Sequence, residues 1–222
     1  MFETRTRLVN GEIKRDTPIN KLNYARGHGC MGTTTLPLLY ELAKFIKPRV
    51  IVVIGSGDGL IPRLFREAQI ASGITGVTYL IDLGETMGAM PEQIHNPSAT
   101  FRQFYPEIIV YKGKSVPDGR EFISKEKQID LLWIDGDHSH EGSLADFNAY
   151  NALISENGLL CFHDTAPNGI NNAQPDWCAV NKTIDYIKEH RRDFELINFT
   201  PTNHLQLGAG FAILKRNLKS TI

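Results

Sequence analysis

Short runs of apolar residues recur along the chain, and stretches with helical spacing separate them. The β-branched run Val50–Ile54 has no polar alternation, which is typical of a strand covered on both faces. Four similar runs follow, over 77–81, 108–111, 129–134 and 159–162. Apolar residues at helical spacing predict helices over 60–68 and 143–154, and the second is expected to stop at Asn157-Gly158. Alternating strands and helices predict a parallel, doubly wound α/β sheet.

The end of the chain has a different order of elements. A helix predicted over 180–190 is followed by two strands, 194–199 and 210–214, with no helix between them. A parallel connection needs a dozen residues or more, so these strands must be antiparallel. The sequence therefore predicts one Rossmann-like domain over 36–222, with a seven-stranded mixed sheet and a C-terminal antiparallel hairpin.

The bulk composition is that of an ordinary globular protein, and it excludes several classes. The 24 basic residues nearly balance the 25 acidic ones, so the chain lacks the positive excess that proteins use to bind phosphate backbones. No apolar run approaches the roughly 20 residues that cross a bilayer, and the start is not signal-like. We expect a cytoplasmic protein that binds neither nucleic acid nor membrane, and a homo-oligomer stays open. Cys30, Cys161 and Cys178 have no paired spacing and are expected to be reduced and structural.

Glycines and an acidic residue follow the first two strands, which is where doubly wound sheets bind ligands. Gly55, Gly57 and Gly59 free the backbone to turn tightly and to approach a ligand. The dinucleotide pattern G-x-G-x-x-G needs a glycine where this chain has Leu60, so an NAD site is not favoured. Asp82 can accept hydrogen bonds from the two hydroxyls of a ribose. These residues indicate a ribose-containing ligand without naming the rest of it.

Polar side chains converge after the fourth and fifth predicted strands. The group comprises Asp135, Asp137, His138, His140, His163 and Asp164. Carboxylates suit Mg²⁺ or Mn²⁺, and such an ion could bind a substrate hydroxyl and lower its pKa. His163 can ligate Mn²⁺, Fe²⁺ or Zn²⁺ but disfavours Mg²⁺. A structural interpretation stays open, in which Asp135 and Asp164 only cap the turns that follow their strands.

Two features resemble known families. The G-x-G-x-G turn, the acid after the second strand and the closing hairpin resemble class I S-adenosylmethionine-dependent methyltransferases over about residues 36–215. The stretches IDLLWIDGDHSHEG (129–142) and NGLLCFHD (157–164) are similar to the group that includes macrocin O-methyltransferase and cephalosporin-hydroxylase-type proteins. The resemblance implies an enzyme that transfers a methyl group from S-adenosylmethionine to a hydroxyl of a small-molecule acceptor, assisted by a divalent metal such as Mg²⁺ or Mn²⁺.

The resemblance also implies roles for single residues. The cofactor would be bound by residues that follow the first four strands: Gly55, Gly57, Gly59, Asp82, Gly113, Ser115 and Asp135. Asp135 and Asp164 would be metal ligands together with His163, where metal-dependent relatives often carry a second acid. His138 matches the position proposed as general base, and Asp135 is the second catalytic candidate. An ordinary imidazole, with a pKa of about 6.5, suits a base at neutral pH.

Other functions and the acceptor remain open from the sequence. Asp137-His138-Ser139-His140 superficially resembles a two-metal hydrolase cluster, but that signature has histidines before the aspartate and belongs to an αββα sandwich. A protein of the S-adenosylmethionine-binding fold could also have an activity other than methyl transfer. The complete glycine set together with Asp82 favours a working cofactor site. The N-terminal segment 1–35 and the loop 168–175 are expected to cover the active site and to select among sugar, catechol and peptide-derived hydroxyls.

Overall fold

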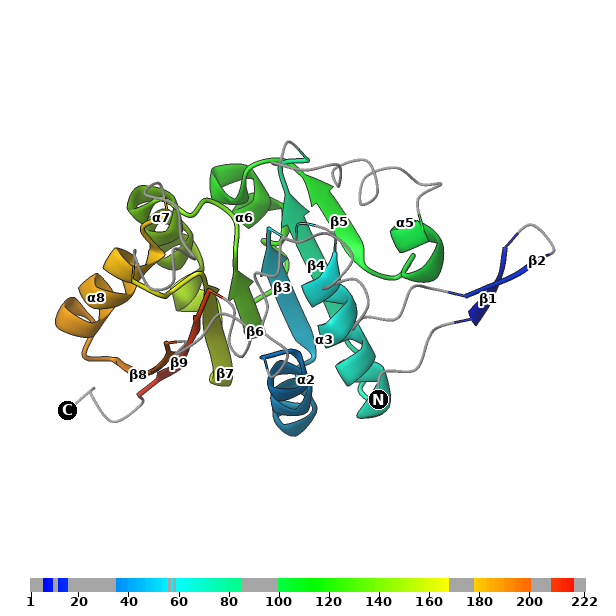
Figure 1. Cartoon of the computed structure of the whole chain (residues 1–222), viewed down its shortest axis with the longest axis horizontal. Coiled ribbons are helices and arrows are strands. Elements are labelled where there is room, and N and C mark those ends of the chain that lie inside the picture. The colour runs from blue at the N-terminus through cyan, green and yellow to red at the C-terminus, as the bar shows by residue number, and fades with distance from the viewer. Residues whose placement is uncertain are drawn as a thin grey trace.

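A seven-stranded sheet forms the centre of the protein. The computed structural model describes residues 6–9, 12–15, 35–55, 57, 59–84, 100–167, 178–200 and 209–217. The strand order is β5-β4-β3-β6-β7-β9-β8 (Figure 1). The strands are β3 (Val50–Ile54), β4 (Val77–Asp82), β5 (Ile109–Lys112), β6 (Ile129–Ile134), β7 (Ile154–His163), β8 (Phe194–Phe199) and β9 (Phe211–Arg216). β3 to β7 are parallel, whereas β9 is antiparallel to both β7 and β8. The predicted mixed α/β sheet with its C-terminal hairpin is confirmed.

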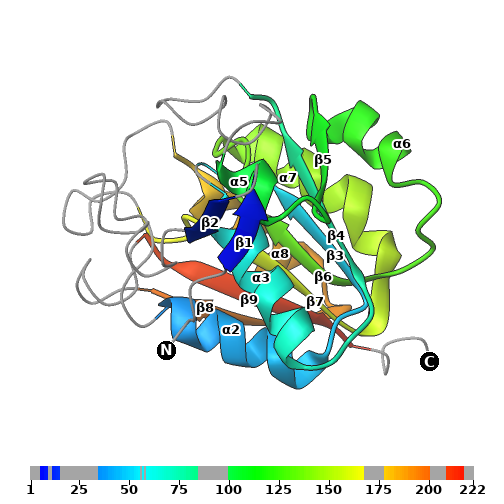
Figure 2. The same ribbon diagram turned by 90° about the vertical axis from the view of Figure 1, so that its right-hand side faces the viewer.

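Helices cover both faces of the sheet, because successive strand residues point to opposite sides. On one side Ile51 and Val53 pack with α2 (Thr35–Ile46), α3 (Leu60–Ala71) and α5 (Thr100–Phe104). On the other side Val52 and Ile54 share a core with α7 (His140–Tyr150) and α8 (Val180–His190). The short α6 (Arg120–Phe122) lies beside α7 in both views, and Figure 2 shows the sheet between the two helix layers.

The order of the strands reverses beside β3. The chain runs from β3 outward to β4 and β5, and then crosses back to β6 and β7 on the other side of β3. Ile54 lies opposite Ile81 of β4 and Ile134 of β6, so the residues that follow these three strands meet at one edge. In doubly wound sheets the ligand crevice opens at this reversal. The two-sheet sandwich that a two-metal hydrolase would need is absent from the described parts of the chain.

The predicted end of the helix over 143–154 is wrong. α7 ends at Tyr150, where the side-chain amide of Asn151 donates to two carbonyls of the last helical turn. β7 already begins at Ile154, and its register against β6 shifts before the regular pairing resumes. Asn157-Gly158, the expected helix stop, therefore lies inside β7 in this irregular part of the ladder.

An N-terminal hairpin was not predicted. It consists of β1 (Thr6–Val9) and β2 (Glu12–Arg15), which pair antiparallel, and β1 contacts α5. Most of 1–35, including Cys30, and all of 168–175 lie outside the described residues, so the expected cover of the active site stays a prediction. Cys161 and Cys178 are buried free thiols, as expected. Among the helices that are described, none is long and apolar enough to cross a membrane.

Candidate active site

The three glycines after β3 suit the backbone conformation there, and two of them leave no room for a side chain. Gly55, Gly57 and Gly59 all have positive φ, at +73°, +53° and +78°. A Cβ atom on Gly55 would overlap the carbonyl oxygen of Asp135, and one on Gly59 would lie 2.7 Å from the ring of Phe101. Nothing lies within 4 Å of such an atom on Gly57. The turn therefore runs directly against the end of β6, and α3 begins at its last glycine.

The predicted residues after β4 and β5 lie side by side. Asp82 is buried, and its Oδ1 accepts a hydrogen bond from the amide of Gly84 at 2.7 Å. The amide of Gly113 donates to the backbone carbonyl of Asp82 at 3.0 Å, which joins the two strand ends. Ser115 follows at the start of the short turn Ser115–Gly119, and its hydroxyl donates to Asp146. The candidate cofactor residues thus occupy adjoining strand ends.

Two histidines and two aspartates form a cluster at the ends of β6 and β7. His138 lies between two carboxylates: Nε2 is 3.4 Å from Oδ1 of Asp135, and Nδ1 is 3.1 Å from Oδ2 of Asp164. Nδ1 of His163 is 3.2 Å from the same Asp135 oxygen and 3.4 Å from Oδ1 of Asp164. His163 is also stacked on Trp133 with ring centroids 5.8 Å apart. Each carboxylate therefore faces both imidazoles.

Mutual charge shifts the pKa values of this His–Asp cluster. Burial opposes the charged form of His138, but hydrogen bonds to Asp135 and Cys178 and the nearby carboxylates raise its pKa to about 11. Burial likewise opposes ionisation of Asp135, yet His163 and His138 hold the pKa of this carboxyl well below its usual range. The pKa of His163 is raised by Asp164 and Asp135 against the effect of burial. The expectation of an ordinary imidazole at position 138 is wrong for this arrangement, because two carboxylates stabilise its proton.

Asp164 has an unusual backbone conformation, and Cys178 borders the His–Asp cluster beside it. Asp164 has a φ of +58°, a left-handed conformation that is uncommon outside glycine and that often marks a functional position. The thiol of Cys178 lies 3.8 Å from the backbone carbonyl of Asp164. Cys178 was expected to be only structural. Its place here could not be read from the sequence, because it precedes α8, far along the chain from His138.

Two of the six converging polar residues lie outside the cluster. Oδ1 of Asp137 accepts from the amide of Ser139, and Ser139 in turn caps the start of α7. His140 is directed toward α8, where Nδ1 lies 2.9 Å from the hydroxyl of Thr183. Both residues stabilise the loop and helix that carry His138.

A family match covers the strands that carry these residues. Residues 52–165, just over half of the chain, match the family described as a methyltransferase domain. The chain belongs to this methyltransferase family. The matched stretch runs from β3 to the residue after Asp164, so it contains the glycine turn, Asp82 and the His–Asp cluster. The methyltransferase family expected from the sequence is confirmed.

Known proteins similar to this methyltransferase share its fold at low identity. The O-methyltransferase from Bacillus cereus in complex with SAH is 17% identical, with a TM-score of 0.62 over 89% of this chain and 88% of that one. The O-methyltransferase TomG from Streptomyces achromogenes, in complex with SAM, is 16% identical, with a TM-score of 0.63 over 92% and 91%. SAH-bound methyltransferase PaMTH1 from Podospora anserina is 13% identical, with a TM-score of 0.64 over 89% and 86%.

One curated relative is much longer than the chain. The uncharacterized protein y4gI from Sinorhizobium fredii is 23% identical over 156 residues. These residues are 67% of this chain but only 17% of that protein. The chain thus spans a small part of the relative.

The donor atoms of the methyltransferase fit a metal ion. Ligand atoms of Asp135, His163 and Asp164 lie within 4.8 Å of one another, and so do those of His138, Asp164 and Cys178. Carboxylate oxygens together with imidazole nitrogen suit Mn²⁺ and later transition metals better than Mg²⁺. The first of these triads is the ligand set predicted from the sequence, and its geometry is compatible with that role.

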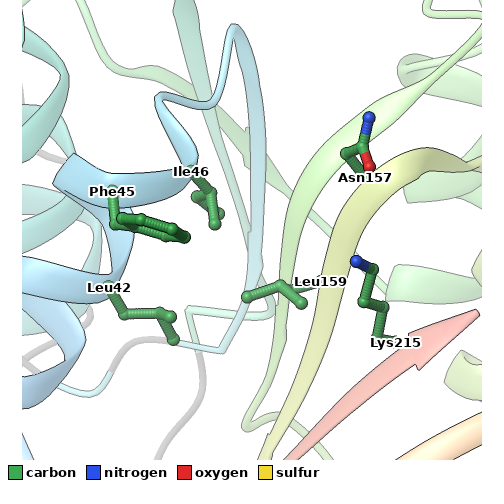
Figure 3. Close-up of a pocket in the computed structure, with 6 residues that line it drawn as sticks. All are labelled: Leu42, Phe45, Ile46, Asn157, Leu159 and Lys215. Atoms are coloured by element: carbon green, nitrogen blue, oxygen red, sulfur yellow. The ribbon is translucent and has the colours of Figure 1, made fainter.

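A separate pocket lies at the opposite edge of the methyltransferase sheet. Leu42, Phe45 and Ile46 of α2 face Leu159 and Lys215 across it (Figure 3). Leu159 lies in the middle of β7, four residues before His163, and pairs with Lys215 near the end of the antiparallel β9. This pocket is therefore distant along the strands from the His–Asp cluster at their carboxyl ends.

Proposed function

We propose that this methyltransferase transfers the methyl group of S-adenosylmethionine to a hydroxyl of a small-molecule acceptor. The observation that carries the proposal is the contact between the glycine turn and the His–Asp cluster, where Gly55 packs directly on the backbone of Asp135. A cofactor on the turn and an acceptor at the cluster would be immediate neighbours. The SAM- and SAH-bound O-methyltransferases of similar fold support the same reaction.

The cofactor would lie along the carboxyl ends of β3, β4 and β5. Gly55, Gly57 and Gly59, which have positive φ and no side chains, would let the methionine end of the cofactor approach the backbone closely. Asp82 would accept the ribose hydroxyls, and the segment from Gly113 to Ser115 would meet the adenine. Asp135, at the end of β6, would border the sulfonium. Similar contacts to a ribose are common in folds with this strand order.

Acceptor activation would be the task of His138 and Asp135. The acceptor oxygen attacks the methyl carbon, the carbon–sulfur bond breaks, and the positive sulfonium becomes the neutral thioether of S-adenosylhomocysteine. The hydroxyl proton goes to His138, which must first release its own proton to solvent. Because Asp135 and Asp164 stabilise the proton that His138 already carries, the imidazole becomes a base only when those carboxylates are engaged elsewhere.

A divalent cation is the group that would engage the carboxylates. Asp135, His163 and Asp164 would hold it, and the nitrogen ligand favours Mn²⁺ over Mg²⁺. Such an ion supplies positive charge that lowers the pKa of an acceptor hydroxyl. The strained backbone of Asp164 and the stacking of His163 on Trp133 support this role, because both fix the direction of a ligand side chain.

The reaction can be tested with a panel of small hydroxyl compounds. Purified protein is incubated with S-adenosylmethionine, Mn²⁺ and sugars, catechols or hydroxylated peptides, and S-adenosylhomocysteine is quantified. We expect acceptor-dependent product with at least one class. Cofactor binding without product from any hydroxyl class would contradict O-methyl transfer and would favour another activity of the same fold.

A further inference from the structure

A buried carboxylate that the proposed mechanism does not use lies behind Ser115. Asp146 of α7 is 1% exposed, and its Oδ1 accepts a hydrogen bond from the Ser115 hydroxyl at 2.5 Å. Its Oδ2 is buried and makes no hydrogen bond. One turn later on α7, the hydroxyl of Tyr150 donates to the carbonyl of Ser115 at 2.7 Å. α7 thus holds Ser115 by its side chain and by its backbone.

The ionised carboxylate fixes the direction of the Ser115 hydrogen bond. A carboxylate only accepts, so the single hydroxyl proton of Ser115 must point at Asp146. Burial is the main cause that raises the pKa of Asp146 to about 6, and nearby Asp137 adds to it, whereas the bond from Ser115 lowers it. The carboxyl is therefore still mainly ionised at neutral pH. The lone pairs of the Ser115 oxygen are what remains for a ligand.

Ser115 is placed to meet the base of a nucleoside whose ribose lies at Asp82. It is only half-buried, and the amide of Gly113 ties its strand end to the backbone of Asp82. A serine oxygen that can accept but not donate matches the exocyclic amine of a 6-aminopurine, which is a donor. The same serine oxygen cannot form a hydrogen bond with the carbonyl of a 6-oxopurine, because both groups are acceptors.

We propose that Asp146 is a positioning residue that fixes Ser115 as a hydrogen-bond acceptor and so makes the cofactor site select adenine over 6-oxopurines. The inference rests on the proposed function, because it assumes a cofactor at the ends of β4 and β5. Asp146 acts through Ser115 and does not itself touch the base.

The test compares two ligands that differ at one position of the base. Calorimetry at pH 7.5 measures the affinities of S-adenosylhomocysteine and S-inosylhomocysteine for the wild type, Asp146→Asn and Ser115→Ala. We expect the wild type to favour the adenosyl ligand by about tenfold or more, as one mismatched hydrogen bond implies. In Asp146→Asn the amide can donate to Ser115, so the hydroxyl is released to donate, and the preference should fall below about threefold.

A matched serine–aspartate pair serves as the control. The Ser155 hydroxyl donates to Oδ1 of Asp130 at 2.7 Å, at the opposite ends of β6 and β7. Ser155→Ala should keep the full preference for the adenosyl ligand. If Asp146→Asn does not fold, the two affinities are measured for the wild type at pH 5, below the pKa of about 6 of Asp146, where the protonated carboxyl can donate to Ser115 and the preference should fall.

Two results would overturn the proposal, and they differ in meaning. If both Asp146→Asn and Ser115→Ala weaken the two ligands by one common factor, or leave them unchanged, Asp146 has only a structural role and the proposed function stands. If the wild type binds neither ligand, the proposed function itself fails and the inference fails with it.

Discussion

The protonation of a side chain in this site depends on the charged groups around it. His138 would be a mostly neutral imidazole in water, but between Asp135 and Asp164 it retains its proton far above neutral pH. Its proposed role as a base is therefore conditional on what else binds the two carboxylates. This dependence cannot be seen in the local sequence, because Asp164 is contributed by a different strand.

Replacing His138 should separate catalysis from cofactor binding. We expect His138→Gln to lower kcat by about 100-fold or more, since general bases typically contribute such factors. Affinity for S-adenosylhomocysteine should change little. His140→Gln makes the same change two residues away, where the side chain faces Thr183, and should keep most of the activity. Equal losses in both variants, measured by initial rates, would remove His138 from the base role.

Asp146 should leave a pH signature in stability. Its pKa is raised in the folded protein to about 6, so its favourable contribution is complete below about pH 4 and is lost as pH rises through 6. Two pKa units correspond to about 3 kcal/mol. Denaturant unfolding should show the wild type losing that much relative to Asp146→Asn between pH 4 and 7. A pH-independent difference between the two proteins would show that the carboxyl is not perturbed.

At the scale of elements, the alternation of apolar runs was sufficient to predict the sheet. Val50–Ile54 contains no polar residue because both faces of its strand are buried. The residue types alone therefore indicate this burial. The end of α7 was not predictable in the same way. Asn157-Gly158 is an ordinary helix stop by local preference, but pairing of β7 with β6 begins before it.

The candidate site also contains residues that the sequence could locate and residues that it could not. The glycine turn, Asp82 and the Asp–His residues after β6 and β7 follow strands, so a sequence pattern could locate them. Cys178 and Asp146 belong to the site only through contacts between distant segments. No local spacing encodes such contacts, which depend on how α7 and α8 pack against the sheet.

Alanine substitutions in the glycine turn should destabilise the protein to different extents. Gly57→Ala adds a side chain into open space, so it should cost only the left-handed backbone penalty, about 1 kcal/mol. Gly55→Ala would also force a methyl group into the backbone of Asp135, and we expect a loss of stability several times larger. Thermal unfolding of both variants measures this. Equal losses would mean that the turn does not pack on the end of β6 as described.

For the whole molecule, the sheet order is what brings cofactor and acceptor chemistry together. β3 lies between β4 and β6, so the glycine turn borders Asp82 on one side and Asp135 on the other. Gly55, Asp82, Asp135 and Asp164, at the ends of four adjoining strands, thereby lie along one edge of the sheet. The same edge gives the molecule its candidate metal site.

Metal dependence should be visible in binding as well as in turnover. We expect EDTA to abolish methyl transfer, Mn²⁺ to restore it, and metal analysis to find bound Mn²⁺ in the wild type but much less in Asp164→Asn. Asp185→Asn, on the exposed face of α8, is the control. Full activity in chelator would exclude a required metal and would leave the His–Asp cluster to act alone.

The most direct test of the central claim is calorimetric binding of S-adenosylhomocysteine to the purified wild-type protein. We expect stoichiometric binding that Asp82→Ala weakens by at least about tenfold while the protein stays folded, because the ribose loses a hydrogen-bond acceptor. No binding at millimolar ligand would contradict S-adenosylmethionine-dependent methyl transfer by this protein.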